Sequence, residues 1–295
     1  MVKLMGKSPK KLAPRKGITL IFGAAGTGKT YEVCKAPWSF FIDTEGGARN
    51  SQYRDLLIKG GGAYLGPEDG SNDIEFVVGQ IKALATTKHK FKTLVIDSFS
   101  KLFNTRVWNR QEEMEVLGEN TASTFGREKK PAIAACQQMV KWFDRLDMGV
   151  LLTCHEAKDW ITNGLKFDGW QKLDYELDLV IRVMKTGIPA KAEVIKSRYT
   201  QFQTGAIFTW NYDTYADMYG RAILDAEVKT AKPATPEEIS YAMQLAGATR
   251  QPIEERVKWF EKAGVNDWAE MDGETICKCT SALQGRLPTE KKDGK

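Results

Sequence analysis

Short apolar runs separated by longer polar or amphipathic stretches dominate the first 215 residues of the chain. Runs of about four to eight residues that are rich in β-branched and aromatic side chains are typical of buried strands, whereas apolar residues at helical spacing are typical of helices. Such alternation favours an α/β fold with a mainly parallel central sheet flanked by helices. We expect strands at 18–22, 39–43, 93–96, 150–153, 177–184, 192–197 and 208–212, and helices from residue 29 to before Pro37, over 74–85 and over 132–147.

Three stretches within this pattern are polar or rich in turn formers, which predicts loops. The second of them is charged and contains the breakers Gly118, Gly126 and Pro131, so we expect a mobile loop with some helix there. The three stretches are 59–73, 104–131 and 157–174.

A linker that contains lysine and proline precedes a C-terminal stretch whose pattern predicts two or three short helices. The first of these is expected to begin at Thr235, because Pro236 suits the first helical position and Glu238 completes a capping box. The chain then divides into a flexible basic arm, a core, a small helical C-terminal region and a disordered tail, at residues 1–16, 17–232, 233–285 and 286–295.

A glycine-rich stretch directly follows the first expected strand and precedes an expected helix. It matches G-x-x-x-x-G-K-[ST], the phosphate-binding loop, in which glycines let successive backbone N–H groups point at phosphate oxygens. The helix that follows adds the positive end of its dipole. The loop comprises Gly23, Ala24, Ala25, Gly26, Thr27, Gly28, Lys29 and Thr30.

The last two residues of this loop have separate roles toward a nucleotide. Lys29 is expected to contact the β- and γ-phosphates, and the hydroxyl of Thr30 is expected to be a ligand of Mg²⁺. The apolar strand at 93–96 ends in Asp97, which is the Walker B pattern, and that carboxylate holds Mg²⁺ directly or through water. The sequence therefore predicts ATP and Mg²⁺ as cofactors.

Two more polar residues follow expected strands at the same edge of the sheet. Ligands bind beyond the carboxyl ends of parallel strands, so Glu45 is placed to polarise a water that attacks a γ-phosphate. His155 can donate a hydrogen bond to that phosphate. The alternatives are a surface carboxylate in a turn for Glu45 and a histidine packed at a strand end for His155.

Lysines and aromatic residues are mixed in the 157–174 stretch. Aromatic rings stack on exposed bases while cations neutralise phosphates, so this composition suits single-stranded DNA. The alternative is a small hydrophobic core beneath a loop. The candidate DNA-binding residues are Lys158, Trp160, Lys166, Phe167, Trp170 and Lys172.

Two basic residues lie near the end of the expected core in the sequence. Lys196 and Arg198 are two residues apart at the end of the expected strand 192–197, so an extended backbone puts them on one face. Two cations held in this way suit a phosphate across a subunit boundary.

Composition adds little beyond these motifs. The net charge of +5 fits a polyanionic partner and fits an ordinary charged surface equally well. No apolar run reaches about 18 residues, so we expect no membrane span and no membrane partner. The basic N-terminus has no apolar segment behind it and the five cysteines are scattered, which favours reduced thiols in a cytoplasm.

In their order along the chain, these motifs resemble the RecA-like recombinase fold over about residues 17–215. FIDTEGGARNSQY resembles the RecA segment with the catalytic glutamate, which corresponds to Glu45, and TLVIDSFSKL resembles its Walker B strand. LLTCHE falls where RecA has a strand that ends in a phosphate-sensing glutamine, a place held here by His155. NGLKFDGWQKLDYELDLVIRVMK resembles the second DNA-binding loop, 108–130 has the position of the first, and EVIKSR resembles the segment whose basic residues reach the neighbouring subunit's ATP.

Within that superfamily the chain resembles compact phage nucleotide-binding proteins, some of which are single-strand annealing ATPases of the Sak group. The resemblance implies a DNA-stimulated ATPase that binds single-stranded DNA and promotes annealing or recombination. It also implies self-association into a ring or filament with ATP at the subunit interfaces, a single-stranded DNA-binding protein as a further partner, and the host bacterial cytoplasm if the protein is phage-encoded. A replicative helicase or helicase-loader type ATPase and a nucleotide-switch partner protein remain as alternatives.

Overall fold

The computed structural model describes residues 16–119, 126–159, 163–185, 187–230, 232–263 and 265–287. The candidate Trp160, most of the basic arm and most of the tail lie outside these ranges. Within the ranges, no helix is both long enough and apolar enough to span a bilayer.

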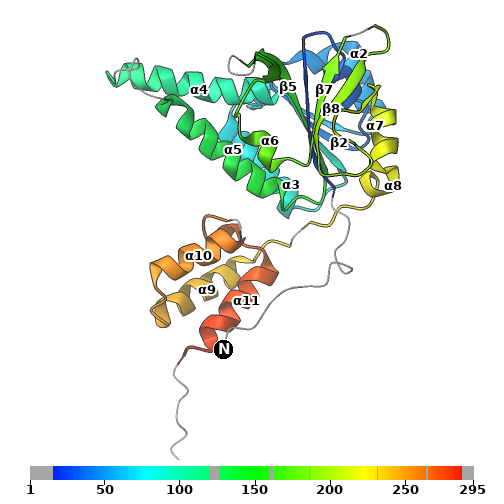
Figure 1. Cartoon of the computed structure of the whole chain (residues 1–295). Helices are drawn as coiled ribbons and strands as arrows, with labels where there is room; N and C mark the ends of the chain where they lie inside the picture. The colour runs from blue at the N-terminus through cyan, green and yellow to red at the C-terminus, as the bar shows by residue number, and fades with distance from the viewer. Residues whose placement is uncertain are drawn as a thin grey trace, which may run out of the picture.

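A nine-stranded sheet forms the middle layer of the larger part of the molecule (Figure 1). Its order is β3-β2-β4-β5-β1-β7-β8-β9, with β6 paired to the end of β5. The strands from β3 to β7 in this order are parallel, β8 is antiparallel to β7, and β9 is antiparallel to β8. The strands are β1 (Ile18–Gly23), β2 (Ser39–Asp43), β3 (Ala63–Leu65), β4 (Thr93–Asp97), β5 (Gly149–Lys158), β6 (Leu165–Phe167), β7 (Leu179–Met184), β8 (Lys191–Ser197) and β9 (Ile207–Thr209).

Helices cover both faces of this sheet, because successive side chains of a strand point to opposite sides. Leu20 and Phe22 of β1 lie in a buried cluster with α3, α4 and α5, whereas Ile21 lies in a second cluster with α1, α2, α7 and α8. Figure 1 shows these two groups of helices on opposite sides of the sheet. The helices of this part are α1 (Lys29–Val33), α2 (Ser51–Gly60), α3 (Ile74–Thr86), α4 (Phe99–Val116), α5 (Lys130–Phe143), α6 (Leu173–Glu176), α7 (Tyr212–Tyr219) and α8 (Arg221–Leu224), with the 3₁₀ turns η2 (Gly47–Arg49), η3 (Pro67–Asp69) and η5 (Arg127–Lys129).

The stretch 59–73 is not the plain loop that we expected. It contains the end of α2, the strand β3, which is parallel to β2, and the turn η3. The glycine content concealed this strand, because β3 has only three residues at the edge of the sheet and all three are half-buried. Neither an apolar run nor an alternation could therefore mark it.

The stretch 104–131 is also different from the expected loop, because α4 continues through Val116. Ser98 begins this helix by accepting a hydrogen bond from the N–H of Lys101, at 3.2 Å. Only one side of α4 is buried, including Leu102 and Val107. A helix that buries a single stripe keeps many charged residues, which is why its sequence was interpreted as a loop.

The strand predicted at 150–153 is ten residues long and continues past His155 to Lys158. Its end forms an antiparallel hairpin with β6, in which Glu156 lies opposite Phe167. In its described part, the 157–174 stretch is therefore half of a hairpin followed by the start of α6. The last predicted strand is shorter than expected, since β9 ends at Thr209 and Tyr212 already begins α7.

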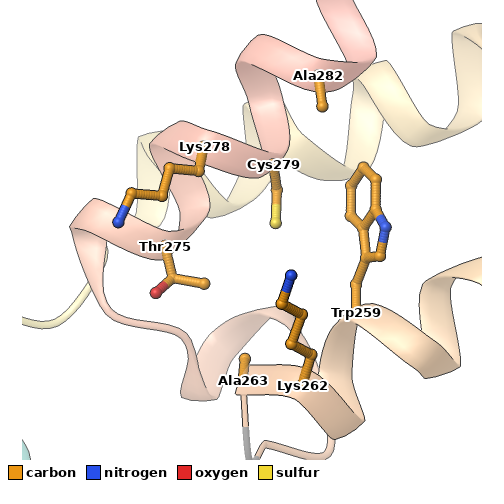
Figure 2. Close-up of a pocket in the computed structure, with 7 residues that line it drawn as sticks. All are labelled: Trp259, Lys262, Ala263, Thr275, Lys278, Cys279 and Ala282. Carbon is orange, nitrogen blue, oxygen red and sulfur yellow. The ribbon is translucent and has the colours of Figure 1, made fainter. Parts of the chain in front are cut away.

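The C-terminal region consists of α9 (Pro236–Ala248), α10 (Ile253–Ala263), the 3₁₀ turn η6 (Trp268–Glu270) and α11 (Gly273–Gln284), around a buried cluster of its own. Thr235 begins α9 with the capping box expected from the sequence. An ion pair between Lys82 of α3 and Glu270, at 3.0 Å, joins this region to the sheet part. A cleft of about 410 Å³ lies between α10 and α11, and Figure 2 shows Trp259 and Cys279 on its walls.

Candidate active site

The glycine-rich loop leaves β1 at the carboxyl edge of the sheet, where Gly23 lies beside His155 of β5. Gly26 and Gly28 have φ values of 74° and 86°, in the left-handed region that side chains disfavour. Gly23 is required for a different reason, because a Cβ atom there would lie 2.3 Å from the carbonyl oxygen of Val183. The three glycines of the motif thus each have a steric role.

The amine of Lys29 folds back over this loop. Its Nζ donates to the carbonyl oxygens of Gly23, at 2.8 Å, and Ala24, at 3.0 Å. Burial lowers the pKa of Lys29. These two partners are neutral carbonyl oxygens, so the contacts do not neutralise the ammonium charge. The ammonium can therefore form a charge-assisted hydrogen bond with a phosphate.

Asp97 is a buried carboxylate at the end of β4. Burial raises its pKa to about 6, although hydrogen bonds from the hydroxyls of Thr153 and Thr30 lower it. These two donors are hydroxyls, and the ammonium of Lys29 in the same pocket interacts with the carboxylate electrostatically. Oxygen donors of this kind suit Mg²⁺, so Thr30 and Asp97 fit the expected metal role.

Glu45 lies just beyond β2 and is held by two neighbours. Its Oε1 accepts hydrogen bonds from the Oγ of Ser98, at 2.6 Å, and from the Nε2 of His155, at 2.7 Å. The hydrogen bond with His155 is the main reason that the pKa of Glu45 falls to about 2. The same hydrogen bond raises the pKa of His155.

These groups share one pocket of about 410 Å³ at the carboxyl edge of the sheet. The residues expected at the phosphates, at the metal and at the attacking water are therefore brought together. Thr153 and Glu156 also line the pocket and were missed, although their positions beside His155 at the end of an expected strand could have indicated them. The pocket is lined by Gly23, Ala24, Ala25, Gly26, Lys29, Thr30, Glu45, Asp97, Ser98, Thr153, His155 and Glu156.

Comparison with known proteins gives the family. Residues 15–205 match an AAA domain family, which is more than half of the chain. The chain belongs to this AAA domain family. Among solved structures, the RadB recombinase is similar, with 17% sequence identity, a TM-score of 0.44 and coverage of 65% of this chain and 86% of that chain. No curated protein matches the chain.

The AAA domain assignment agrees with the architecture already described. A phosphate loop follows the central strand of a mainly parallel sheet, and helices flank both faces. The expected fold class, a mainly parallel central sheet flanked by helices with a small helical C-terminal region, is therefore confirmed.

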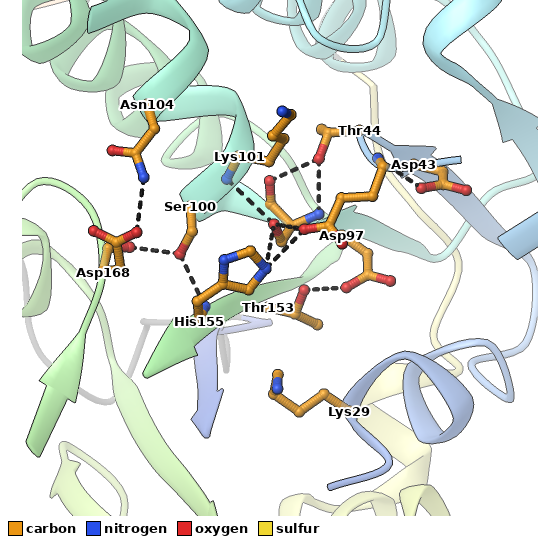
Figure 3. Close-up of polar contacts among 12 residues, drawn as sticks. Lys29, Asp43, Thr44, Asp97, Ser100, Lys101, Asn104, Thr153, His155 and Asp168 are labelled. Atoms are coloured by element: carbon orange, nitrogen blue, oxygen red, sulfur yellow. Dashed lines mark hydrogen bonds and ion pairs between the residues drawn. The ribbon is translucent and has the colours of Figure 1, made fainter. Parts of the chain in front are cut away.

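The pocket of the AAA domain is connected to the β5–β6 hairpin by hydrogen bonds (Figure 3). The N–H of His155 donates to the Oγ of Ser100, at 2.9 Å, and that hydroxyl donates to the carbonyl oxygen of Asp168, at 2.6 Å. Asn104 of α4 donates to the carboxylate of Asp168, at 2.7 Å. The residue that follows β6 is thereby tied both to α4 and to the backbone of His155.

The two aromatic candidates for base stacking that the structure describes are not exposed. Phe167 and Trp170 are only 7% and 8% exposed, and both belong to the core cluster of α3, α4 and α5. The ring of Phe167 packs edge-on against Phe22 of β1, with the ring centroids 6.3 Å apart. The expectation that these two rings stack on bases is therefore wrong for this structure, and the alternative of a hydrophobic core beneath the segment is correct.

The lysines of the same segment are placed differently from its aromatic rings. Lys158 ends β5, and Lys166 of β6 pairs with Asp159 at 3.4 Å. Lys172 is exposed just before α6. The cationic part of the expected DNA-binding segment is thus near the surface.

Lys196 and Arg198 lie at the edge of the sheet opposite to the phosphate loop of their own chain. Lys196 is opposite Val180 near the start of β7 and donates to the carbonyl oxygens of Asp174 and Leu177. Arg198 forms an ion pair with Asp178 at 3.1 Å. Both head groups thus gather on one segment, as their spacing predicted, and within their own chain they are remote from the nucleotide pocket.

Proposed function

We propose that this AAA domain protein hydrolyses ATP in the presence of Mg²⁺ and uses that cycle to bind single-stranded DNA and promote annealing or recombination. The observation that supports the ATPase part most directly is the single pocket that contains the phosphate loop, Asp97 and Glu45. Bound at Thr30 and Asp97, Mg²⁺ would neutralise phosphate charge.

The side chains of the pocket have distinct tasks in this proposal. Lys29 would exchange its two carbonyl partners for phosphate oxygens, which are stronger acceptors because they are charged. The carboxylate of Glu45 would orient the attacking water and accept its proton. Because Ser98 and His155 both donate to Oε1 and keep the pKa of Glu45 low, either contact must weaken before Glu45 becomes a strong base.

The DNA part of the proposal is supported by lysines rather than by aromatic rings. Lys158 and Lys166 lie on the β5–β6 hairpin and Lys172 lies just before α6, where they can neutralise phosphates. Hydrogen bonds through Asp168 join the base of this hairpin to His155. Binding of single-stranded DNA at the hairpin would thereby affect the position of His155 in the pocket. The resemblance to the Sak group supports annealing and a phage origin.

The test measures phosphate release from ATP by the parent protein and by Lys29→Ala, with and without a single-stranded oligonucleotide, in Mg²⁺ and in EDTA. Lys59→Ala on the exposed side of α2 is the matched control. We expect turnover that requires Mg²⁺, rises with the oligonucleotide, and is lost in Lys29→Ala only. A parent protein without turnover under all conditions would contradict the ATPase proposal.

A second assay addresses annealing. Two complementary labelled oligonucleotides are mixed with the parent protein and ATP, and duplex formation is followed by fluorescence transfer. Faster duplex formation than without protein supports annealing. Turnover without strand binding or annealing would instead favour the nucleotide-switch alternative, and unwinding of a preformed duplex would favour the helicase alternative.

A further inference from the structure

Asp43, the last residue of β2, is only 1% exposed, and its carboxylate accepts four hydrogen bonds. Its Oδ1 accepts from the backbone N–H groups of Glu45, at 3.0 Å, and Gly46, at 2.8 Å. Its Oδ2 accepts from the backbone N–H of Ala48, at 2.8 Å, and from the hydroxyl of Tyr64, at 3.1 Å. Three of the four donors thus belong to the turn that carries Glu45.

We propose that Asp43 is the positioning residue for Glu45, and this inference rests on the proposed ATPase function. The backbone of a turn can adopt many conformations, and each would point the Glu45 side chain in a different direction. One carboxylate that binds the N–H of Glu45 itself and two N–H groups after it removes that freedom. A catalytic group held in place before the reaction begins lowers the entropic part of the barrier.

Neighbouring elements fix Asp43 and its turn from both sides. Tyr64 of β3 donates to the carboxylate, and the hydroxyl of Ser71 donates to the carbonyl oxygen of Asp43. On the other side, the hydroxyl of Thr44 exchanges hydrogen bonds with the backbone of Ser98, at 2.9 Å each. The same Ser98 donates to the carboxylate of Glu45. The backbone and the head group of Glu45 are therefore held by separate sets of contacts.

Substitution of Asp43 by Asn tests this role, because the side chain keeps its shape but gains an amide that must face at least one of the donors. Asp69→Asn is the matched control: Asp69 accepts a backbone N–H in the turn η3, at 3.2 Å, without touching the Glu45 turn. Tyr64→Phe removes one donor and leaves all three backbone contacts. For each variant, kcat, KM, nucleotide affinity, thermal stability and the amide exchange rates of Glu45, Gly46 and Ala48 are measured.

We expect kcat of Asp43→Asn to fall about 10- to 100-fold, the scale of a misplaced catalytic group, while nucleotide affinity stays within about threefold. The three amides should exchange faster, Asp69→Asn should stay close to the parent, and Tyr64→Phe should lower kcat less than Asp43→Asn does, because all three backbone contacts remain. In the double variant Asp43→Asn, Glu45→Gln, kcat should match that of Glu45→Gln alone, because the position of a side chain that cannot act as a base no longer matters. Losses that multiply in the double variant, or an unchanged kcat, would overturn the positioning role.

The two levels of the inference fail in different ways. A parent protein that does not hydrolyse ATP contradicts the proposed function and with it the catalytic role of Asp43. If the parent is active but the three amides of Asp43→Asn exchange as slowly as those of the parent, the proposed function stands and the inference about Asp43 is overturned.

Discussion

The nucleotide pocket and the 157–174 segment were both predicted from residue types and spacing, and the structure treats them differently. In the pocket, the phosphate loop, Asp97 and Glu45 face one volume, as their positions after strands required. Among the candidate residues of the segment that the structure describes, Phe167 and Trp170 are buried, and the three lysines remain near the surface. Geometry that depends on neighbours in sequence was predictable, whereas the exposure of an aromatic ring was not.

The physical cause of this contrast is the range of the interactions involved. Gly26 and Gly28 adopt left-handed conformations that their own lack of a side chain permits. By contrast, Phe167 is buried because Phe22, 145 positions earlier by the printed numbering, offers it a partner ring in the core. The residue type alone does not distinguish a ring that stacks on a base from a ring that packs in the core, since both use its apolar face.

The largest expected effect concerns the aromatic side of this contrast. Trp170→Ala should lower the free energy of unfolding by about 3–5 kcal/mol, because it empties a buried indole site. Trp108→Ala is the control, since Trp108 is 52% exposed on α4 and should cost less than about 1 kcal/mol. Urea denaturation measures both. A stable Trp170→Ala protein with weakened binding of single-stranded DNA would reverse the assignment of this residue to the core.

The next effect concerns the pocket. Glu45→Gln should still bind ATP but hydrolyse it ~10²-fold or more slowly, because the amide cannot accept the proton of the attacking water. Single-turnover phosphate release and nucleotide affinity separate these two properties. Hydrolysis at the parent rate would mean that Glu45 is a turn residue, and the pocket would then be no better predicted than the 157–174 segment.

Lys196 and Arg198 are remote from the pocket of their own chain, and the sequence predicts that they reach ATP across a subunit boundary. On that hypothesis, each single Ala substitution should lower turnover by roughly tenfold or more with little change in nucleotide affinity, because the phosphate that these cations meet would belong to another subunit. Mixing Lys29→Ala with Arg198→Ala tests this, since one protein keeps the two cations and the other keeps the phosphate loop. Partial recovery of turnover supports shared sites, and no recovery at any ratio contradicts them.

The contact between Glu45 and His155 should make stability depend on pH. The raised pKa of His155 contributes stability that is complete below its usual value of about 6.5 and is lost as pH rises through the folded-state value. The lowered pKa of Glu45 contributes stability above its usual value that is lost as pH falls toward about 2. The free energy of unfolding of His155→Gln should therefore differ most from that of the parent between about pH 5 and 6.5, the range in which both groups are charged.

The size of that difference is limited to about 1 kcal/mol, because both side chains are nearly half exposed. Thermal unfolding of the parent and of His155→Gln at pH 6 and at pH 9 measures it. If the difference in thermal stability between the two proteins is larger at pH 9 than at pH 6, it would contradict an ion pair between Glu45 and His155.

The smallest effect concerns the lysines of the 157–174 segment. Lys172→Ala should weaken binding of single-stranded DNA modestly and reduce the slope of log affinity against log salt by about 0.7, the value for one phosphate contact. Lys59→Ala on α2 is the control and should leave the slope unchanged. Equal slopes in the parent and Lys172→Ala would remove Lys172 from the DNA surface.

Much of the site was predictable because motif residues follow strands directly. Glu45, Asp97 and His155 each come at or just beyond the carboxyl end of an expected strand, and parallel strands bring those ends to one edge. Thr153 was missed although it lies on the same strand as His155. Asp43 could not be recognised as a support for Glu45, because its partners include Tyr64, which lies on a strand that the glycine-rich pattern concealed.

The sequence by itself determined the phosphate loop, the strand before it, the alternation of strands and helices, and the capping box at Thr235. These features depend on backbone sterics and on hydrogen bonds between residues a few positions apart. Only the tertiary structure decided the length of β5, the helical state of 104–116 and the burial of Trp170. Each of these depends on which distant surface is available to cover an apolar group or to pair a strand, and that choice is made by the packed fold as a whole.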